Sequence, residues 1–180
     1  MVHPARRTLG FSLIELILVV LIIGIVVSVA VPKMNRSARG ASAKALKMDL
    51  ARLYSAIELY AVEHDGKPPD QNIKAQLTQY SNFTGTTTSA MKKPATGIVY
   101  GPYLTKIPTL TVGSKKGADE IYHTSNESET PATADPKQGW WYNSATRRVV
   151  ANLPDSEVDE DNVPYNTYTG GTADARGVGG

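Results

Sequence analysis

The sequence contains no cysteine in its 180 residues. This absence excludes disulfide bridges, thiol catalysis and metal sites built on cysteine. Histidine is nearly as scarce, and the three present, His3, His64 and His123, have no spacing typical of a metal site. The P-loop, Gly-x-Ser-x-Gly and His-Glu-x-x-His motifs are also missing. We therefore predict that the protein is not an enzyme, requires no cofactor, and stabilises its folded part by packing instead of disulfides.

The chain also lacks a strong excess of either charge. It carries 19 basic and 17 acidic residues, which gives a formal net charge of +2. Arg6 and Arg7 account for this difference, so the sequence after residue 10 is formally neutral. A protein that binds nucleic acid normally presents a basic face to the phosphates. We therefore expect no nucleic-acid partner.

Charged residues are missing altogether between Leu16 and Pro32. Counted from Phe11, this apolar run has 22 residues to Pro32, and Glu15 is its only ionisable side chain. A membrane-spanning helix needs roughly 20 predominantly apolar residues, so we predict a hydrophobic transmembrane and assembly helix over residues 11–33. An acidic side chain at mid-bilayer costs about 2.5–3.5 kcal/mol. A plain anchor has no reason to carry Glu15, which we therefore interpret as a functional residue that pairs with a partner.

Two arginines are followed by Gly10 and Phe11, then by Glu15 and an unbroken apolar stretch. This start of the sequence resembles the class III signal of type IV pilins and of the pseudopilins of type II secretion, most closely that of a major pseudopilin. Gly24 and Pro32 lie where this family commonly has a helix-weakening glycine and proline. The resemblance covers about the first 35 residues.

This resemblance implies a pilin-like α+β fold, in which a long N-terminal helix, membrane-spanning in its first half, is packed by a small antiparallel β-sheet head. Residues 1–10 would be a prepilin leader, cut between Gly10 and Phe11 by prepilin peptidase before the new N-terminus is methylated. The implied function is that of a structural subunit of a type II secretion pseudopilus, assembled into a helical filament that supports protein export. Besides the peptidase, the implied partners are copies of itself and other pseudopilins, an inner-membrane assembly platform, and membrane lipid before assembly.

The implied location is the bacterial inner membrane, crossed once, with the leader in the cytoplasm and the head in the periplasm until the filament assembles. Basic residues are more numerous after the apolar run than before it, and taken alone this distribution indicates the opposite orientation. Ser28-Val29-Ala30 also fits the end of an ordinary secretory signal. Two other functions stay open: a type IV pilin of a surface fibre for adhesion, motility or DNA uptake, and a membrane-tethered or secreted binding protein.

Glu15 itself has two interpretations. Cleavage would leave a charged amine on Phe11, and in an apolar filament this amine and the carboxylate would each be stranded without solvent. We predict that they pair, preferably between neighbouring subunits, because such a contact also sets the axial register. Alternatively, Glu15 extends to the lipid headgroups.

From residue 34 the pattern becomes that of an amphipathic helix, which we predict over residues 34–66. It is expected to end at Gly66, a typical C-cap residue followed by two prolines. Gly24 and Pro32 predict a kink or local melting in the preceding segment. The apolar stripe of this helix has a spacing of three and four residues: Leu46, Leu50, Leu53, Ile57 and Ala61.

Residues 67–169 are predicted to form a small globular α+β head, and the glycine-rich residues 170–180 a flexible tail. A short helix is expected over residues 70–80, with Asp70 as its cap. Residues 125–137 are typical of an exposed loop.

A β-hairpin is predicted from residues 139–143 and 147–151, with its aromatic side chains packed on the apolar stripe. Because side chains alternate across a strand, one of Trp140 and Trp141 should face the core and the other should be partly exposed. A carbohydrate or peptide platform is the alternative interpretation of the two tryptophans.

An acidic run occupies residues 155–161, and two interpretations stay open. The run is a solvated loop, or it holds calcium through Asp155, Asp159 and Asp161, because clustered hard oxygen ligands suit this ion. The resemblance adds that major pseudopilins of type II secretion bind calcium in a carboxyl-terminal loop. The spacing is not that of an EF-hand.

Overall fold

The computed structural model describes residues 11–170, and their side chains except those of residues 29–39. The predicted leader lies outside the described residues, as does the predicted tail apart from Gly170. The chain divides into two compact units, Met1–Ala38 and Arg39–Gly180. The second unit contains the head.

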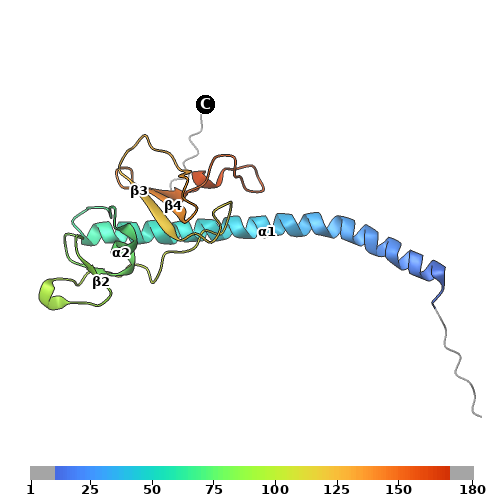
Figure 1. Ribbon diagram of the computed structural model, residues 1–180, viewed down its shortest axis with the longest axis horizontal. Coiled ribbons are helices and arrows are strands. Elements are labelled where there is room, and N and C mark those ends of the chain that lie inside the picture. Colours follow the sequence, from blue (N-terminus) through green and yellow to red (C-terminus); the bar gives the residue numbers. More distant parts are fainter. Residues whose placement is uncertain (1–10, 171–180) are drawn as a thin grey trace, which may run out of the picture. The chain divides into compact units, whose positions relative to one another are not determined.

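The head combines the C-terminal part of one long helix with two small sheets and short helical turns (Figure 1). This α+β content agrees with the sequence prediction and is consistent with a pilin-like fold. In chain order the helices, strands and 3-10 turns (η) are α1 (Leu13–Glu63), α2 (Ile73–Thr78), β1 (Tyr80–Ser81), β2 (Thr88–Ser89), η1 (Pro94–Thr96), β3 (Glu120–Thr124), β4 (Gln138–Asn143), β5 (Arg148–Ala151) and η2 (Tyr165–Thr167).

Helix α1 is continuous along its whole length. The local melting expected around Gly24 and Pro32 is therefore absent from this described helix. Proline removes only one backbone N–H donor, so the neighbouring turns keep their hydrogen bonds. The predicted end of the helix is confirmed. Gly66 has a φ of 77° and donates its N–H to the Ala61 carbonyl at 2.8 Å, which closes the last turn.

The larger sheet has the order β3-β4-β5, and it corrects the prediction of an antiparallel sheet. Strands β4 and β5 form the predicted antiparallel hairpin, but β3 and β4 are parallel. Parallel neighbours need a crossover connection of about a dozen residues or more. The loop of residues 125–137 is long enough to provide it, and sequence reasoning treated that loop only as an exposed connection. Strands β1 and β2 form a separate antiparallel pair.

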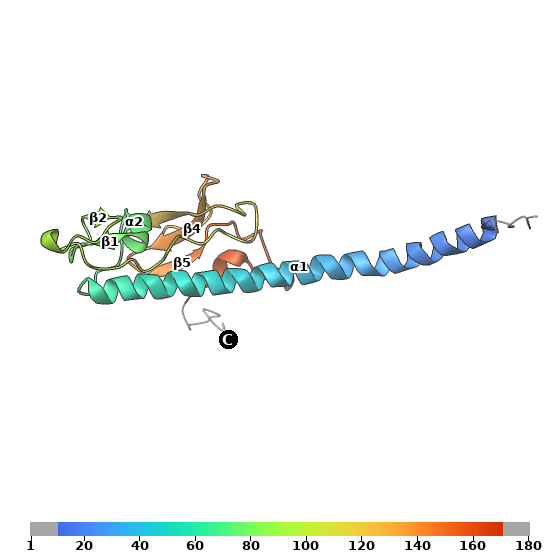
Figure 2. The same cartoon turned by 90° about the horizontal axis from the view of Figure 1, so that it is seen from below.

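The core lies between the sheet and the C-terminal part of α1, along which β4 and β5 run (Figure 2). Every residue of the predicted apolar stripe is buried, which confirms that prediction. Trp140 is buried against it and donates its indole N–H to the Pro108 carbonyl at 2.7 Å. The prediction for Trp141 is wrong, because its side chain is only 2% exposed. Val150, paired with it on β5, is buried too, so the second face of the sheet is also covered.

Helix α2 is shorter than predicted, and Asp70 is not its cap. Asn72 occupies the cap position, without a side-chain capping bond. The Asp70 carboxylate instead accepts hydrogen bonds from the Asn72 N–H at 3.2 Å and from the Gln76 side chain at 3.0 Å. Asp70 lies two residues before the cap position and therefore fixes the approach to the helix.

Candidate assembly site

The N-terminal unit exposes an apolar surface. The side chains of residues 11–28 are all exposed, and most of them are leucine, isoleucine or valine. Soluble monomers rarely expose contiguous apolar patches above a few hundred Å², so this surface marks a site of contact with another molecule. Among the described residues, no helix combines the length and the hydropathy required to cross a membrane.

Glu15 lies in the first turn of α1 and closes it. Its carboxylate accepts the Ser12 N–H at 3.2 Å, while the Ser12 carbonyl accepts the Leu16 N–H at 3.2 Å. A serine followed three residues later by glutamate is the signature of a capping box, a signal that sequence reasoning missed. The carboxylate is thereby turned back toward the N-terminus of the helix, where the helix dipole favours negative charge.

The predicted processing junction is only half described. Phe11 is the first described residue and its side chain is exposed, whereas Gly10 lies outside the described residues. Cleavage between them stays a prediction.

The acidic loop is organised around Asp159, whose side chain is buried. Its carboxylate accepts the Asp161 N–H at 2.8 Å and the Val163 N–H at 2.9 Å, and also the Tyr168 hydroxyl. Burial raises the pKa of Asp159, but these three hydrogen bonds, together with the Lys47 ammonium, lower it below its usual value. The carboxylate therefore stays ionised and holds the loop closed through donors of its own chain.

The other two predicted calcium ligands do not converge on Asp159. The Asp155 carboxylate accepts the Asn166 side-chain amide at 2.6 Å, and the exposed Asp161 contributes its backbone N–H to the loop. Within the described ranges, no group of three histidine, aspartate or glutamate side chains has a metal-binding arrangement. The arrangement does not fit a calcium site, and calcium binding stays a prediction without geometric support.

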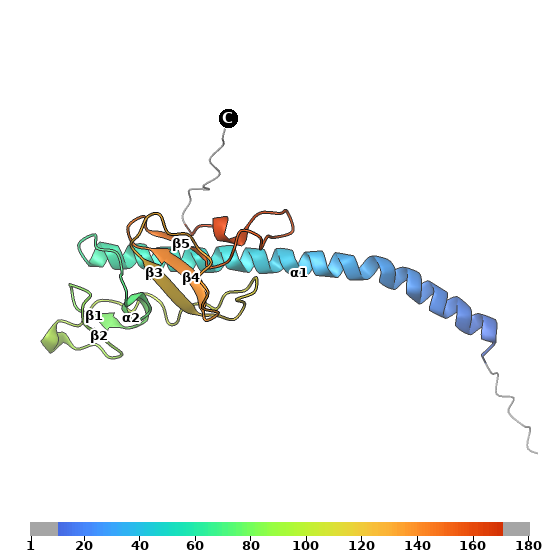
Figure 3. The same ribbon diagram turned by 45° about the horizontal axis from the view of Figure 1, so that its top comes forward.

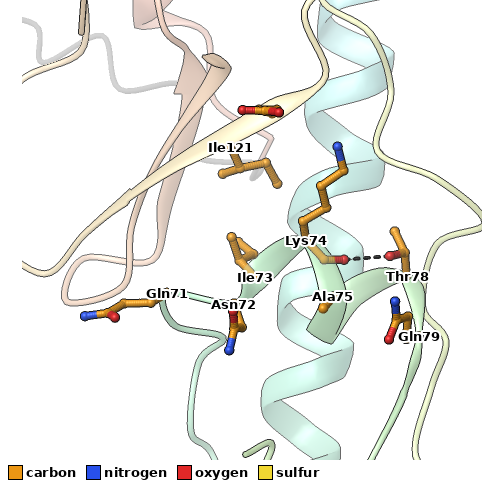
Figure 4. Close-up of a pocket in the computed structure, with 9 residues that line it drawn as sticks. Gln71, Asn72, Ile73, Lys74, Ala75, Thr78, Gln79 and Ile121 are labelled. Atoms are coloured by element: carbon orange, nitrogen blue, oxygen red, sulfur yellow. Dashed lines mark hydrogen bonds between the residues drawn. The ribbon is translucent and has the colours of Figure 1, made fainter. Parts of the chain in front are cut away.

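Two surface hollows of the head carry no recognisable chemistry. The first, about 420 Å³, lies between α2 and β3, and its wall includes the helical hydrogen bond from the Thr78 hydroxyl to the Lys74 carbonyl (Figure 4). The second, about 440 Å³, contains His123, whose Nε2 lies 2.9 Å from the Ser144 hydroxyl. Asp70 lines the same hollow, but its bonds go to other residues, so no carboxylate orients the imidazole for catalysis within the described chain.

Comparison with known proteins shows that the chain is similar to type II secretion and competence proteins. It is 31% identical over 78 residues to type II secretion system core protein G of Vibrio cholerae. The aligned region covers 43% of this chain and 53% of that protein. It is 30% identical over 74 residues to the core protein G of Pectobacterium carotovorum, 41% of this chain and 47% of that protein. Competence protein ComGC of Halalkalibacterium halodurans is 31% identical over 68 residues, 38% of this chain and 67% of that protein.

The chain thus spans about half the length of the two secretion proteins and two thirds of the competence protein. No protein-family profile and no solved structure matches it. None of the relatives' names denotes an enzyme, which agrees with the lack of catalytic motifs in the sequence. The secretion and competence relatives, the α+β head and the exposed apolar N-terminal segment agree with one another. The protein belongs to the family of type IV pilins and type II secretion pseudopilins.

Proposed function

We propose that the protein is a structural subunit of a type II secretion pseudopilus. Prepilin peptidase cleaves it between Gly10 and Phe11, and residues 11–33 hold it in the bacterial inner membrane with the head in the periplasm. At an inner-membrane platform it then joins copies of itself and other pseudopilins in a filament. The observation that carries this proposal is the exposed apolar surface of residues 11–28, which holds a single carboxylate at its start.

Glu15 directs the assembly step in this proposal. In an apolar filament the Glu15 carboxylate needs a cationic partner. Cleavage creates such a cation close by, the N-terminal amine of Phe11. Phe11 lies two residues before the start of α1, and the capping bond to Ser12 already turns the Glu15 carboxylate toward that end. Of its two oxygens only one is engaged by Ser12, so the amine of a neighbouring subunit fits as a second donor.

Two substitutions separate capping from charge. Glu15→Gln keeps a capping side chain but removes the charge, and Glu15→Ala removes both. Breaking a buried ion pair by removing one partner costs about 3–5 kcal/mol, so both variants should lose filaments, counted by electron microscopy. N-terminal sequencing should still begin at Phe11, because the peptidase reads the glycine junction, and membrane insertion should improve slightly. Normal filaments from Glu15→Gln protein would refute the pairing, and a loss confined to Glu15→Ala would assign Glu15 to capping alone.

A surface fibre used in DNA uptake is the second candidate function. It is favoured by the competence relative, of which the chain covers two thirds. The neutral sequence after residue 10 argues against direct binding of nucleic acid to this subunit. Deletion of the gene distinguishes the two functions: loss of protein export supports the pseudopilus, whereas loss of transformation with normal export supports the fibre.

A further inference from the structure

Outside α1, the described head exposes large apolar side chains in two places, and each place also carries charge. The first is the tip, defined here as Phe83, Met91, Lys92 and Lys93. The side chain of Met91 is 70% exposed and that of Phe83 is 51% exposed, and both lysines are exposed. Two backbone hydrogen bonds between Lys93 and Ile98, at 2.9 and 3.1 Å, close the turn that presents the lysines.

The second place is the acidic rim, defined as Glu160, Asp161 and Val163. Val163 is 37% exposed, and both carboxylates are exposed beside it. The buried Asp159 carboxylate accepts two backbone N–H groups from this segment and so fixes its shape. Among the side chains that the structure describes, which do not include those of residues 29–39, none of the four charged side chains of the tip and the rim forms an ion pair.

The tip and the rim lie at opposite ends of the head. The Phe83 ring is 5.9 Å from Tyr100, whose ring is 5.4 Å from His64, just past the end of α1. The Glu160 carboxylate lies instead against Gly40 of α1. A Cβ atom added to Gly40 would lie only 2.8 Å from a Glu160 carboxylate oxygen. From Gly40 to the end of α1 the helix rises about 35 Å. The ribbon views agree, with the yellow-green segment around η1 at one end of the head and the red segment around η2 toward the other (Figure 3).

We propose that the tip of one copy docks on the acidic rim of a second copy of this chain. Two lysines beside exposed apolar side chains face two carboxylates beside an exposed valine, so the surfaces are complementary in charge and both contain an apolar contact. Because they are separated by the length of the head, the contact cannot form within one chain. This inference rests on the proposed function in a filament and adds to it a contact between heads.

The geometry selects a second copy as the partner, because the two surfaces differ. A symmetric dimer would place tip against tip or rim against rim and bring like charges together. A head-to-tail contact instead leaves a free tip and a free rim on every pair, and such heterologous contacts extend into open helical filaments when the rotation between copies does not close a ring. Exposed ion pairs each contribute little, so the contact sets orientation and register, while the apolar N-terminal segments supply most of the association.

Cysteine cross-linking tests the contact directly, because the chain has no cysteine of its own. Full-length Lys93→Cys and Asp161→Cys proteins, carrying different tags, are expressed together and oxidised. The expected product is a disulfide-linked dimer that carries both tags. Lys116→Cys paired with Asp161→Cys is the matched control, since Lys116 is exposed but lies outside the tip. Absence of the mixed dimer, or equal yield from the control pair, overturns the proposal, as does a cross-link formed only to a different protein.

Charge reversal tests whether the contact matters for assembly. Reversing the tip (Lys92→Glu with Lys93→Glu) or the rim (Glu160→Lys with Asp161→Lys) places like charges together and should reduce filament number by about tenfold or more. Filaments should return when the two reversals are combined in one chain, while Lys106→Glu with Lys116→Glu should leave them unchanged. Failure of the combined variant to recover contradicts the contact. If the cross-linked mixed dimer forms but the wild-type chain assembles no filaments, the contact is supported and the proposed function is refuted.

Discussion

Replacing Leu53 by alanine should destabilise the head far more than the same replacement at Leu59. Both leucines belong to α1, but Leu53 is fully buried in the core, whereas Leu59 is 50% exposed. Removing a fully buried leucine side chain costs about 2–5 kcal/mol, because transfer free energy is lost and a cavity remains. Leu59 already keeps half of its surface in water, so its loss is expected to cost less than about 1 kcal/mol.

The assay is thermal unfolding of a fragment that begins at Met34, followed by circular dichroism. This fragment is expected to be a soluble, folded monomer, since the apolar segment is removed and the stripe on α1 is covered within the same chain. Leu53→Ala should lower the melting temperature by roughly 10 °C and Leu59→Ala by a few degrees. Equal shifts for the two variants, or a parent fragment that precipitates or is unfolded, would refute the assignment of the core.

Two further predictions concern conditions rather than packing. The calcium hypothesis for Asp155, Asp159 and Asp161 requires that a chelator lower the melting temperature of the head, because an ion bound only to the folded state stabilises it; an unchanged melting curve removes it. Burial lowers the pKa of His123, although the Asp70 charge opposes this, so protonation disfavours the fold. The stability contributed by His123 is present above the ordinary histidine pKa of about 6.5 and is lost as pH falls below it. His123→Gln should therefore melt with a smaller loss between neutral and mildly acidic pH than the parent, and an identical pH dependence would contradict the burial argument.

Much of the fold could be predicted from local patterns in the sequence. The stripe from Leu46 to Ala61 is buried because its spacing follows the helix period, and that period depends on geometry within one helix. The end of α1 was equally readable, since Gly66 adopts a positive φ that glycine adopts without strain. The β4–β5 hairpin also joins neighbouring segments, so its pairing needed no knowledge of distant residues.

Features that depend on segments far apart in the sequence could not be predicted from local patterns. Alternation along β4 separates the faces of Trp140 and Trp141, but it does not reveal whether the second face is covered. The direction of β3 depends on the path of a long loop, and no strand was predicted over Glu120–Thr124. The capping role of Glu15 follows from a local pattern, Ser12 three residues earlier, but this pattern lies at the start of an apolar run that by itself indicates a membrane helix.

A head without cysteine must hold its loops by other means, and Asn152 shows how. Its side chain is fully buried directly after β5. The amide oxygen accepts the N–H groups of Ala132 and Thr133 at 2.8 and 3.0 Å, and the amide nitrogen donates to the Thr133 hydroxyl at 2.6 Å and to the Gln138 carbonyl at 2.8 Å. All four bonds available to an asparagine amide are made, and leaving one of them unmade in a buried site would cost about 1–3 kcal/mol. The long crossover loop is thereby tied to the edge of the hairpin at one point. Because these bonds form without oxidation, closure of the head does not depend on the redox state of the compartment in which it folds.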